Sequence, residues 1–138
     1  MNARFILGAA YTAVAIATGM PAAAHGPTET VTPHFEKAIP NIPGKAMKVV
    51  IVHYPPGGAS VPHSHADSSF IFAHVLSGEI VSKVNDGAAE TYRAGESWYE
   101  PPASRHLVSR NASKTKPARL LAVFVLDSDE KTLTTPIE

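Results

Sequence analysis

Seven histidines are the residues of this sequence best suited to chemistry, and two of them stand two positions apart. His63 and His65 form a His-x-His motif directly after the turn-forming run Pro55-Pro56-Gly57-Gly58. Side chains at positions i and i+2 of a β-strand lie on the same face, so the two imidazoles can meet one metal ion. The motif alone is weak evidence for a metal site, because many histidines with this spacing have only a structural role.

The elements that must position these histidines read as short strands. Turn signals recur every few residues, and no segment has a convincing helical period. Such a pattern is typical of a β-sandwich or β-barrel. We expect strands at residues 46–54, 68–76, 79–85, 89–93, 97–100, 105–111 and 118–126.

The composition excludes several classes of site and partner. Twelve basic and twelve acidic residues balance each other, and no basic block is present, so we expect no nucleic-acid partner. The chain has no cysteine, which excludes disulfides and zinc–thiolate sites.

Residues 1–24 have the three-part layout of a secretory signal peptide. The uncharged run from Phe5 to Thr18 is too short for the ~20 residues that span a bilayer, which argues against the alternative of a membrane anchor. We expect cleavage after Ala24 and a periplasmic or secreted protein without a stable membrane span. His25 would then be the amino terminus, where amine and imidazole could chelate copper with a second histidine; no separate partner for it is evident.

Two segments of the chain closely resemble the two motif segments of the cupin family. The first reads Gly-x5-His-x-His from Gly57 to His65, with Gly78 closing the following strand. The second reads Gly-x5-Pro-x-Ala-x2-His from Gly95 to His106. They occur in the family's order, separated by a strand, a turn and a strand.

This resemblance spans about residues 49–124 and implies an all-β fold, a single antiparallel β-barrel of jelly-roll type. We place the barrel at residues 45–127, after an N-terminal arm at 25–44 that holds one short strand at most. A loose polar tail follows at 128–138.

The resemblance also implies one divalent metal ion, Fe, Mn, Zn, Cu or Ni, held by His63, His65 and His106. The glutamate of the family's first segment is missing: its place falls on Ser69, Phe70 or Ile71. A three-histidine site without that carboxylate carries one more positive charge and should favour an anionic ligand with two oxygen donors. Open positions on such a metal suit catalysis.

Two smaller departures accompany the missing glutamate. Ala103 stands where the family usually has glycine, and Asn111 comes one residue later than the family's asparagine. Glu100 immediately precedes Pro101 in the second segment and lies six residues before His106. It could be a fourth ligand or a general acid or base, or it could face solvent at the end of its strand.

Other candidates have structural interpretations. Phe70, Phe72 and Phe124 read as core or cavity wall. His74 should face away from Ile71, on the surface or at a subunit contact. We interpret His53 as structural or as a neighbour of the ligands.

The first functional hypothesis is a metal-dependent small-molecule enzyme, similar to the three-histidine cupins that act as iron dioxygenases. A non-enzymatic metal- or ligand-binding protein is the second, and a structural cupin with an empty site is the third. The resemblance further implies a homodimer that pairs through strands at the barrel edge, since pairing would cover an exposed edge.

Overall fold

A computed structural model describes residues 28–138, so the expected signal peptide and His25 lie outside the described part. Within residues 28–138 every regular element is a β-strand, and no helix is long and apolar enough to cross a membrane. The strands are β1 (Thr30–Ala38), β2 (Lys45–Tyr54), β3 (His63–Ser64), β4 (Phe70–Ser77), β5 (Glu79–Val84), β6 (Glu90–Arg93), β7 (Ser97–Glu100), β8 (Arg105–Asn111), β9 (Ala118–Asp127) and β10 (Thr135–Pro136).

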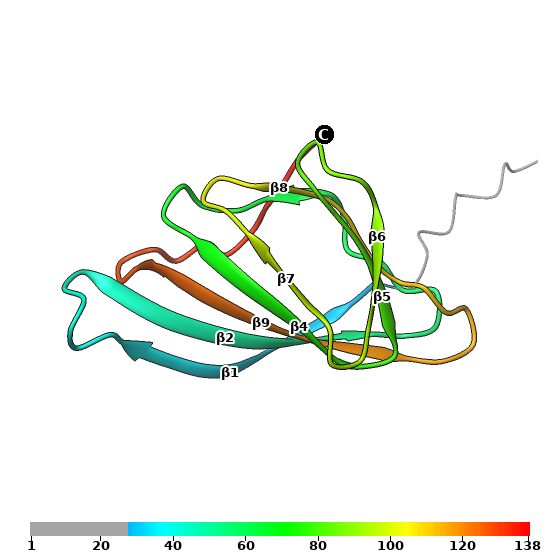
Figure 1. The fold of residues 1–138 in the computed structure, drawn as a ribbon. Coiled ribbons are helices and arrows are strands. Elements are labelled where there is room, and N and C mark those ends of the chain that lie inside the picture. The colour runs from blue at the N-terminus through cyan, green and yellow to red at the C-terminus, as the bar shows by residue number, and fades with distance from the viewer. Residues whose placement is uncertain (1–27) are drawn as a thin grey trace, which may run out of the picture.

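The strands form two five-stranded sheets in which every pair of neighbours is antiparallel (Figure 1). One sheet has the order β1-β2-β9-β4-β7, and the other has the order β10-β3-β8-β5-β6. This arrangement fits a jelly roll, and it confirms the all-β prediction. The barrel consists of two separate sheets and is not one continuous sheet closed on itself.

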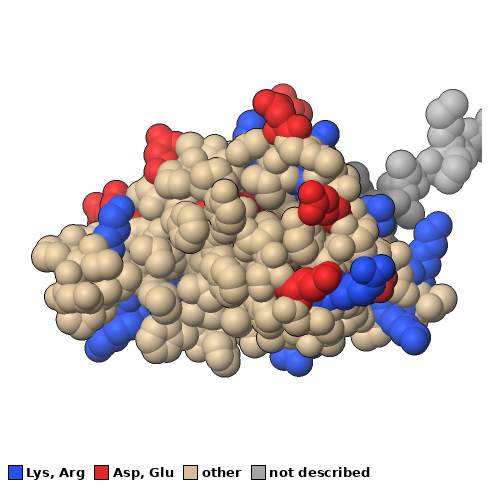
Figure 2. Space-filling view, in the orientation of Figure 1, with Lys and Arg blue, Asp and Glu red and all other residues tan. Residues whose placement is uncertain are grey.

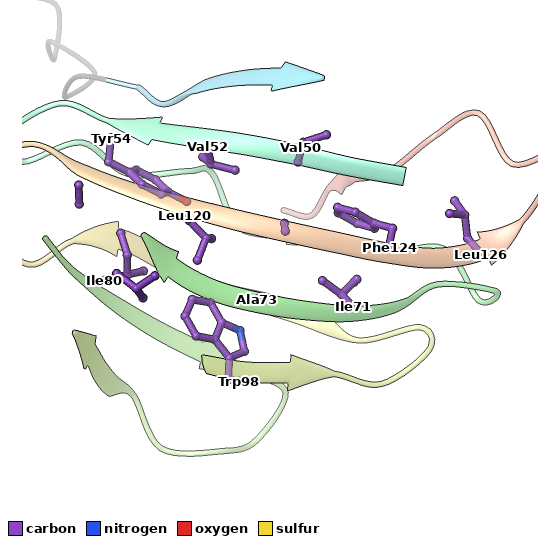
Figure 3. Packing of buried hydrophobic residues seen from close by; sticks show 13 residues of the cluster. Val50, Val52, Tyr54, Ile71, Ala73, Ile80, Trp98, Leu120, Phe124 and Leu126 are labelled. Atoms are coloured by element: carbon purple, nitrogen blue, oxygen red, sulfur yellow. The ribbon is translucent and has the colours of Figure 1, made fainter. Parts of the chain in front are cut away.

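The core lies between the two sheets, and alternation along each strand supplies it. In β9 the small or apolar residues at every second position point inward and are buried, from Ala118 to Leu126. Figure 3 shows Phe124 and Leu120 of β9 beside Val50 and Val52 of β2. Burying a side chain of this size contributes about 1.5–3 kcal/mol, so the period of two is the main determinant of the fold.

Both ends of the described part, residues 28–138, hold more regular structure than the sequence suggested. The expected arm holds a nine-residue strand, β1, which pairs along β2. The tail is not loose: Thr135 and Pro136 pair with β3, and Leu133 packs against the core. The apolar side chain of Leu133 is the physical reason, because burying it holds the polar residues around it in place.

Two phenylalanines predicted as core or cavity wall are instead on the surface. Phe70 and Phe72 are 44% and 43% exposed. Ile71 and Ala73 occupy the inward positions of β4, so residues one place away must face solvent. His53 is also exposed, at an outward position of β2, which excludes contact with the metal ligands.

Candidate metal centre

The three predicted ligands come together because β3 and β8 are neighbours in one sheet. His63 and His106 are directly opposite each other across the β3–β8 ladder, and His65 follows one position beyond the end of β3. All three side chains are buried. One ring nitrogen from each lies within 4.8 Å of the other two, so the group could hold a metal ion.

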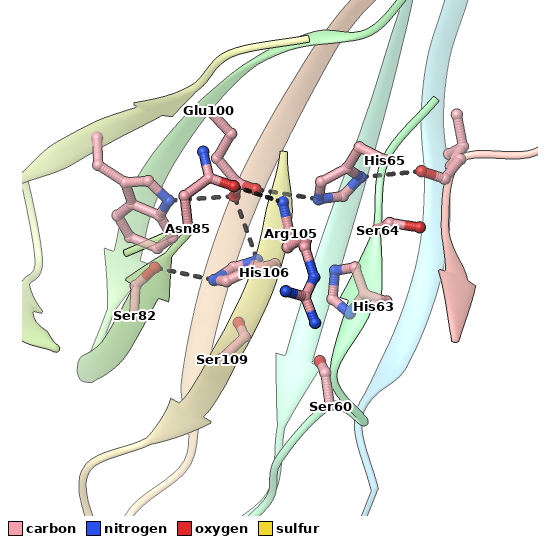
Figure 4. A network of polar contacts seen from close by, with 12 residues as sticks. Ser60, His63, Ser64, His65, Ser82, Asn85, Glu100, Arg105, His106 and Ser109 are labelled. Carbon is pink, nitrogen blue, oxygen red and sulfur yellow. Dashed lines mark hydrogen bonds and ion pairs between the residues drawn. The ribbon is translucent and has the colours of Figure 1, made fainter. Parts of the chain in front are cut away.

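Each imidazole is held in orientation by a protein oxygen on the side away from the cluster. The Nδ1–H of His63 donates to the carbonyl of Val61 at 2.8 Å, and that of His65 donates to the carbonyl of Leu133 at 2.9 Å. The Nε2 of His106 is 2.8 Å from the Ser82 hydroxyl (Figure 4). Metal-binding histidines characteristically use their second nitrogen in this way, because the bond fixes both tautomer and ring orientation.

Glu100 points into this cluster and not toward solvent. Its side chain is buried, with Oε2 3.0 Å from His65 Nε2 and Oε1 3.2 Å from His106 Nδ1. The Trp98 indole N–H donates to Oε1 at 3.2 Å. Alternation along β7 explains the placement, since Trp98 and Glu100 take the two inward positions and Tyr99 faces out.

Glu100 also lies beside the place of the missing family glutamate. Ile71, one of the three candidate positions, points inward from β4, and Glu100 is its direct partner on the neighbouring strand β7. Directly opposite residues of an antiparallel pair have Cβ atoms about 4.5–5.5 Å apart. A carboxylate is therefore present in the same part of the site, supplied by the next strand.

The chemistry of these donors fits a cation. A carbonyl only accepts hydrogen bonds, so the proton of neutral His65 must be on Nδ1, and its Nε2 carries a lone pair. That lone pair faces the Glu100 carboxylate, a second acceptor, and both His65 Nε2 and Glu100 Oε2 are buried without a hydrogen-bond partner. Two buried acceptors 3.0 Å apart repel each other unless a proton or a metal ion joins them. The residues thus fit a divalent metal.

The cluster lies at the wall of a cavity of about 260 Å³ between the two sheets. Val50, Val52, Leu120 and Phe124 contribute to its largely apolar lining. Among the described residues that line it there is no Lys or Arg, and its acidic residues are Glu29 and Glu100. An anionic ligand would therefore depend on the metal for its positive charge.

Burial keeps the imidazoles neutral and available. Desolvation lowers the pKa of His106 to about 4, against the opposing effect of Glu100, and it also lowers the pKa of His63. Burial by itself would raise the pKa of the Glu100 carboxyl, but its interactions with His65, His106 and the indole N–H of Trp98 outweigh burial, so that pKa is lowered. Neutral imidazoles and an ionised carboxylate are the forms that bind metals.

We predict that the metal-free protein loses stability as the pH falls from about 6.5 to about 4. In this window unfolded His106 binds a proton that folded His106 does not, so acid favours unfolding. The loss by pH 4 is on the order of 3 kcal/mol from this residue. Urea unfolding of chelator-treated protein at a series of pH values measures it. His106→Gln should flatten the curve in this window, and an unchanged curve would contradict the assignment.

Several contacts at the site were not found from the sequence. Ser82 could have been, because it takes the inward position two residues after Ile80 in a strand that alternates. The Leu133 carbonyl carries no sequence signal, since a backbone oxygen 68 positions from His65 is placed only by the fold. The sequence indicated only that Tyr54 belongs to a buried strand. In the structure its hydroxyl is 2.7 Å from that of Ser109 at the cavity wall.

The two smaller departures from the family pattern have structural explanations. Ala103 adopts a left-handed φ of 59°, a conformation that glycine takes without strain, and this accounts for the family's glycine. The side chain of Asn111 is buried, and its amide donates to the carbonyls of Pro55 and Lys116. It joins two turns one residue later than in the family pattern.

Solved structures of other proteins share this fold. A protein with a double-stranded β-helix domain from Klebsiella pneumoniae superposes with a TM-score of 0.62 at 19% identity, over 80% of this chain and 88% of its own. Protein TT1209 from Thermus thermophilus superposes with a TM-score of 0.58 at 24% sequence identity, over 72% of this chain and 84% of its own. An oxalate oxidase in complex with glycolate superposes with a TM-score of 0.56 at 23% sequence identity, over 73% of this chain and 52% of its own.

No curated protein matches the sequence. The sequence profile of the family described as "Cupin domain" matches residues 50–124, more than half of the chain. Those residues include both motif segments, the three histidines and Glu100. The chain therefore belongs to the cupin family.

Proposed function

We propose that this cupin is a metal-dependent enzyme that acts on a small molecule bound through two oxygen atoms, in the manner of a dioxygenase. The observation that carries the proposal is the convergence of three buried imidazole nitrogens and one carboxylate on a single point of the cavity wall. His63, His65 and His106 would hold one divalent metal. A metal there would supply a Lewis acid and a binding position for oxygen ligands.

The rest of the cavity supports a small, largely apolar substrate with a polar end. Val52, Leu120 and Phe124 would pack against its body and exclude water. The hydroxyls of Ser60 and Ser109 each lie within 2.9 Å of the Tyr54 hydroxyl, and all three residues line the cavity. This hydroxyl group could bind a second oxygen of the substrate. The oxalate oxidase with a similar fold supports small hydroxy- and oxo-acids as the first class to test.

We further propose that Glu100 takes the place of the absent family glutamate and lies next to the bound metal. It reaches the site from β7 and not from β4, and its Oε2 has no hydrogen-bond partner of its own. From this position it can ligate the metal or accept a proton from a substrate hydroxyl. Trp98 holds Oε1 and so limits the rotation of the carboxylate.

Oxygen uptake with product analysis tests the activity. The protein, loaded separately with Fe(II), Mn(II) or Ni(II), is mixed in air with a panel of small hydroxy- and oxo-acids. We expect metal-dependent oxygen uptake and a new product with at least one acid, both lost in His106→Ala. Tight binding of an acid that is recovered unchanged with every metal would instead support a non-enzymatic binding protein.

The Glu100→Gln variant tests the role of the carboxylate. The amide keeps the size of the side chain and removes its charge, so we expect metal affinity to fall by about 10–100-fold and turnover by at least about 100-fold at saturating metal. A competition titration with a chelator measures the affinity. Glu90→Gln, which changes an exposed glutamate of β6, is the matched control and should alter neither quantity. Wild-type affinity together with wild-type turnover in Glu100→Gln would refute the role.

A further inference from the structure

Glu29 brings a second carboxylate to the cavity, at its mouth. Val31 and Val61 line the cavity and are 50% and 59% exposed, so the cavity opens to solvent beside them. Val31 faces the cavity from β1, and Glu29, two positions earlier, lies on the same side of the chain. Glu29 is half-buried and lines the cavity as well. A negative charge therefore lies where a ligand would enter.

This carboxylate lies next to the hydroxyl cluster, which consists of Tyr54, Ser60 and Ser109. The register of β1 against β2, continued by one residue beyond Thr30, sets Glu29 opposite Tyr54. Directly opposite residues of an antiparallel pair have Cβ atoms about 4.5–5.5 Å apart. Burial raises the pKa of the Tyr54 hydroxyl, and the negative charge of Glu29 adds to that rise, which agrees with this proximity. The mouth of the cavity thus combines a carboxylate with three hydroxyl groups.

In the described part of the chain no basic side chain neutralises Glu29. On the outside of the molecule several acidic residues have basic partners: Glu79 is 3.1 Å from Arg93, and Asp127 is 2.6 Å from Lys45. Figure 2 shows Lys and Arg side chains close to Asp and Glu side chains on one face. By contrast, none of the ion pairs within the described part involves Glu29, and no Lys or Arg of that part lines the cavity. A ligand can supply the missing positive charge.

The hydroxyl cluster suits a protonated primary amine. The Tyr54 hydroxyl is 2.9 Å from that of Ser60 and 2.7 Å from that of Ser109. Each hydroxyl has one proton and two lone pairs, so the cluster has more acceptors than donors. A protonated primary amine has three N–H donors and no acceptor. It can therefore donate to the hydroxyl oxygens and form an ion pair with Glu29 at the same time.

The hydroxyl cluster and the three histidines line one cavity but lie at different places along it. Ser109 follows His106 by three positions in β8, which corresponds to about 10 Å of strand. A ligand whose carboxylate reaches the histidines can therefore place a distal amine near the mouth. With a divalent metal bound, Glu29 and Glu100 balance its charge, and a ligand without net charge preserves that balance. A simple carboxylate would add an uncompensated negative charge in largely apolar surroundings.

We propose that the cavity recognises a zwitterionic small molecule, with its carboxylate toward the three histidines and a protonated primary amine between Glu29 and the hydroxyl cluster. The inference rests on the function proposed above, because the carboxylate end needs the metal. It narrows the class of hydroxy- and oxo-acids to those with a distal amine. Glu29 is then a specificity-determining residue that selects the substrate by its charge at the entrance of the cavity.

Isothermal titration calorimetry of the purified protein loaded with Ni(II) tests this recognition. The probes are γ-aminobutyrate, δ-aminovalerate and ε-aminocaproate, each compared with the terminal hydroxy acid of the same length. We expect at least one amino acid to bind at least ~10-fold more tightly than its hydroxy counterpart, because charge-assisted hydrogen bonds are the stronger ones. Glu29→Gln should abolish this preference. Glu90→Gln, which changes an exposed glutamate of β6, is the matched control and should keep it, and both variants should retain the metal content and thermal midpoint of the parent.

Charge reversal at the same position gives a second test. In the parent, δ-aminovalerate should bind more tightly than glutarate, the dicarboxylate of the same length, and Glu29→Lys should reverse this order. Equal affinities for amino and hydroxy acids in the parent, or a preference for the amine that survives both Glu29 variants, would overturn the inference.

The same titrations separate this inference from the proposed function. Hydroxy acids that bind and are turned over, without any preference for an amine, would overturn the inference alone. An amine preference that Glu29→Gln abolishes, with every acid recovered unchanged in the oxygen-uptake assay, would support the inference and contradict the proposed enzymatic activity. Failure of every acid to bind the metal-loaded protein would contradict both.

Discussion

Replacing His63 or His106 with alanine will weaken metal binding by more than about 100-fold, the largest effect expected of any substitution in this protein. Each imidazole is one of the three that meet within 4.8 Å in the described part of the chain, and each is oriented by its own oxygen partner. Removing one takes away a direct nitrogen ligand, and the fold fixes the two remaining imidazoles and the carboxylate in positions from which they cannot replace it.

Elemental analysis of purified protein, followed by chelator competition, measures this loss. The matched control is His53→Ala, since His53 is an exposed histidine on β2, outside the cavity. We expect about one metal ion per chain in the parent and in the control, and almost none in the two site variants. Equal metal content in all four proteins would show that the bound ion lies elsewhere.

The second large effect is on stability: Gly78→Ala will lower the free energy of unfolding by about 3–4 kcal/mol. Gly78 joins β4 to β5 with a φ of +75°, a region that costs a residue with a side chain about 1–2 kcal/mol. A Cβ atom there would also lie 2.8 Å from both the Pro117 carbonyl and the Ala118 Cβ. Overpacking of this kind adds about 1–3 kcal/mol, since buried backbone must move.

Gly44→Ala separates the two causes. Gly44 has nearly the same φ, +77°, but an added Cβ would meet nothing within 4 Å. The control should therefore cost only about 1–2 kcal/mol, that of the conformation itself. Urea unfolding of both variants gives the difference. Equal losses would mean that the chain around Pro117 moves aside without cost.

The fold class and the pairing of His63 with His65 at one site could be predicted from the sequence for the same reason. Both depend on local patterns, the alternation in segments such as residues 118–126 and the spacing of His63 and His65, and a strand converts spacing directly into a shared face. The family resemblance added His106, which no local pattern links to the other two. The ladder between β3 and β8 brings His106 opposite His63.

The sequence does not show which face of a strand points into the core when both of its faces are apolar. Phe70 and Phe72 look more suited to a core than Ile71 and Ala73, yet the smaller pair is buried. A shift of one residue turns every side chain of a strand over, so hydrophobicity alone is ambiguous where both faces are apolar.

The position of Glu100 could not be predicted from the sequence for a different reason, because it depends on long-range strand pairing. By sequence it is one acidic residue at the end of a short strand, and a solvent-facing position was a reasonable alternative. Its role at the site follows from pairing between β7 and β4, which sets it beside Ile71, and from the imidazoles that arrive from the other sheet. Contacts between segments this far apart in the sequence are a property of the whole fold.

X-ray absorption spectroscopy at the edge of the metal that copurifies with the protein tests the central claim most directly. The account predicts one ordered ion per chain with nitrogen and oxygen donors at about 2.0–2.2 Å, including the multiple-scattering signature of about three imidazoles. Glu100→Gln should alter the oxygen donors and keep the imidazole signature. A copurifying metal with one imidazole or none, or a spectrum that His106→Ala leaves unchanged, would contradict the assignment of this site.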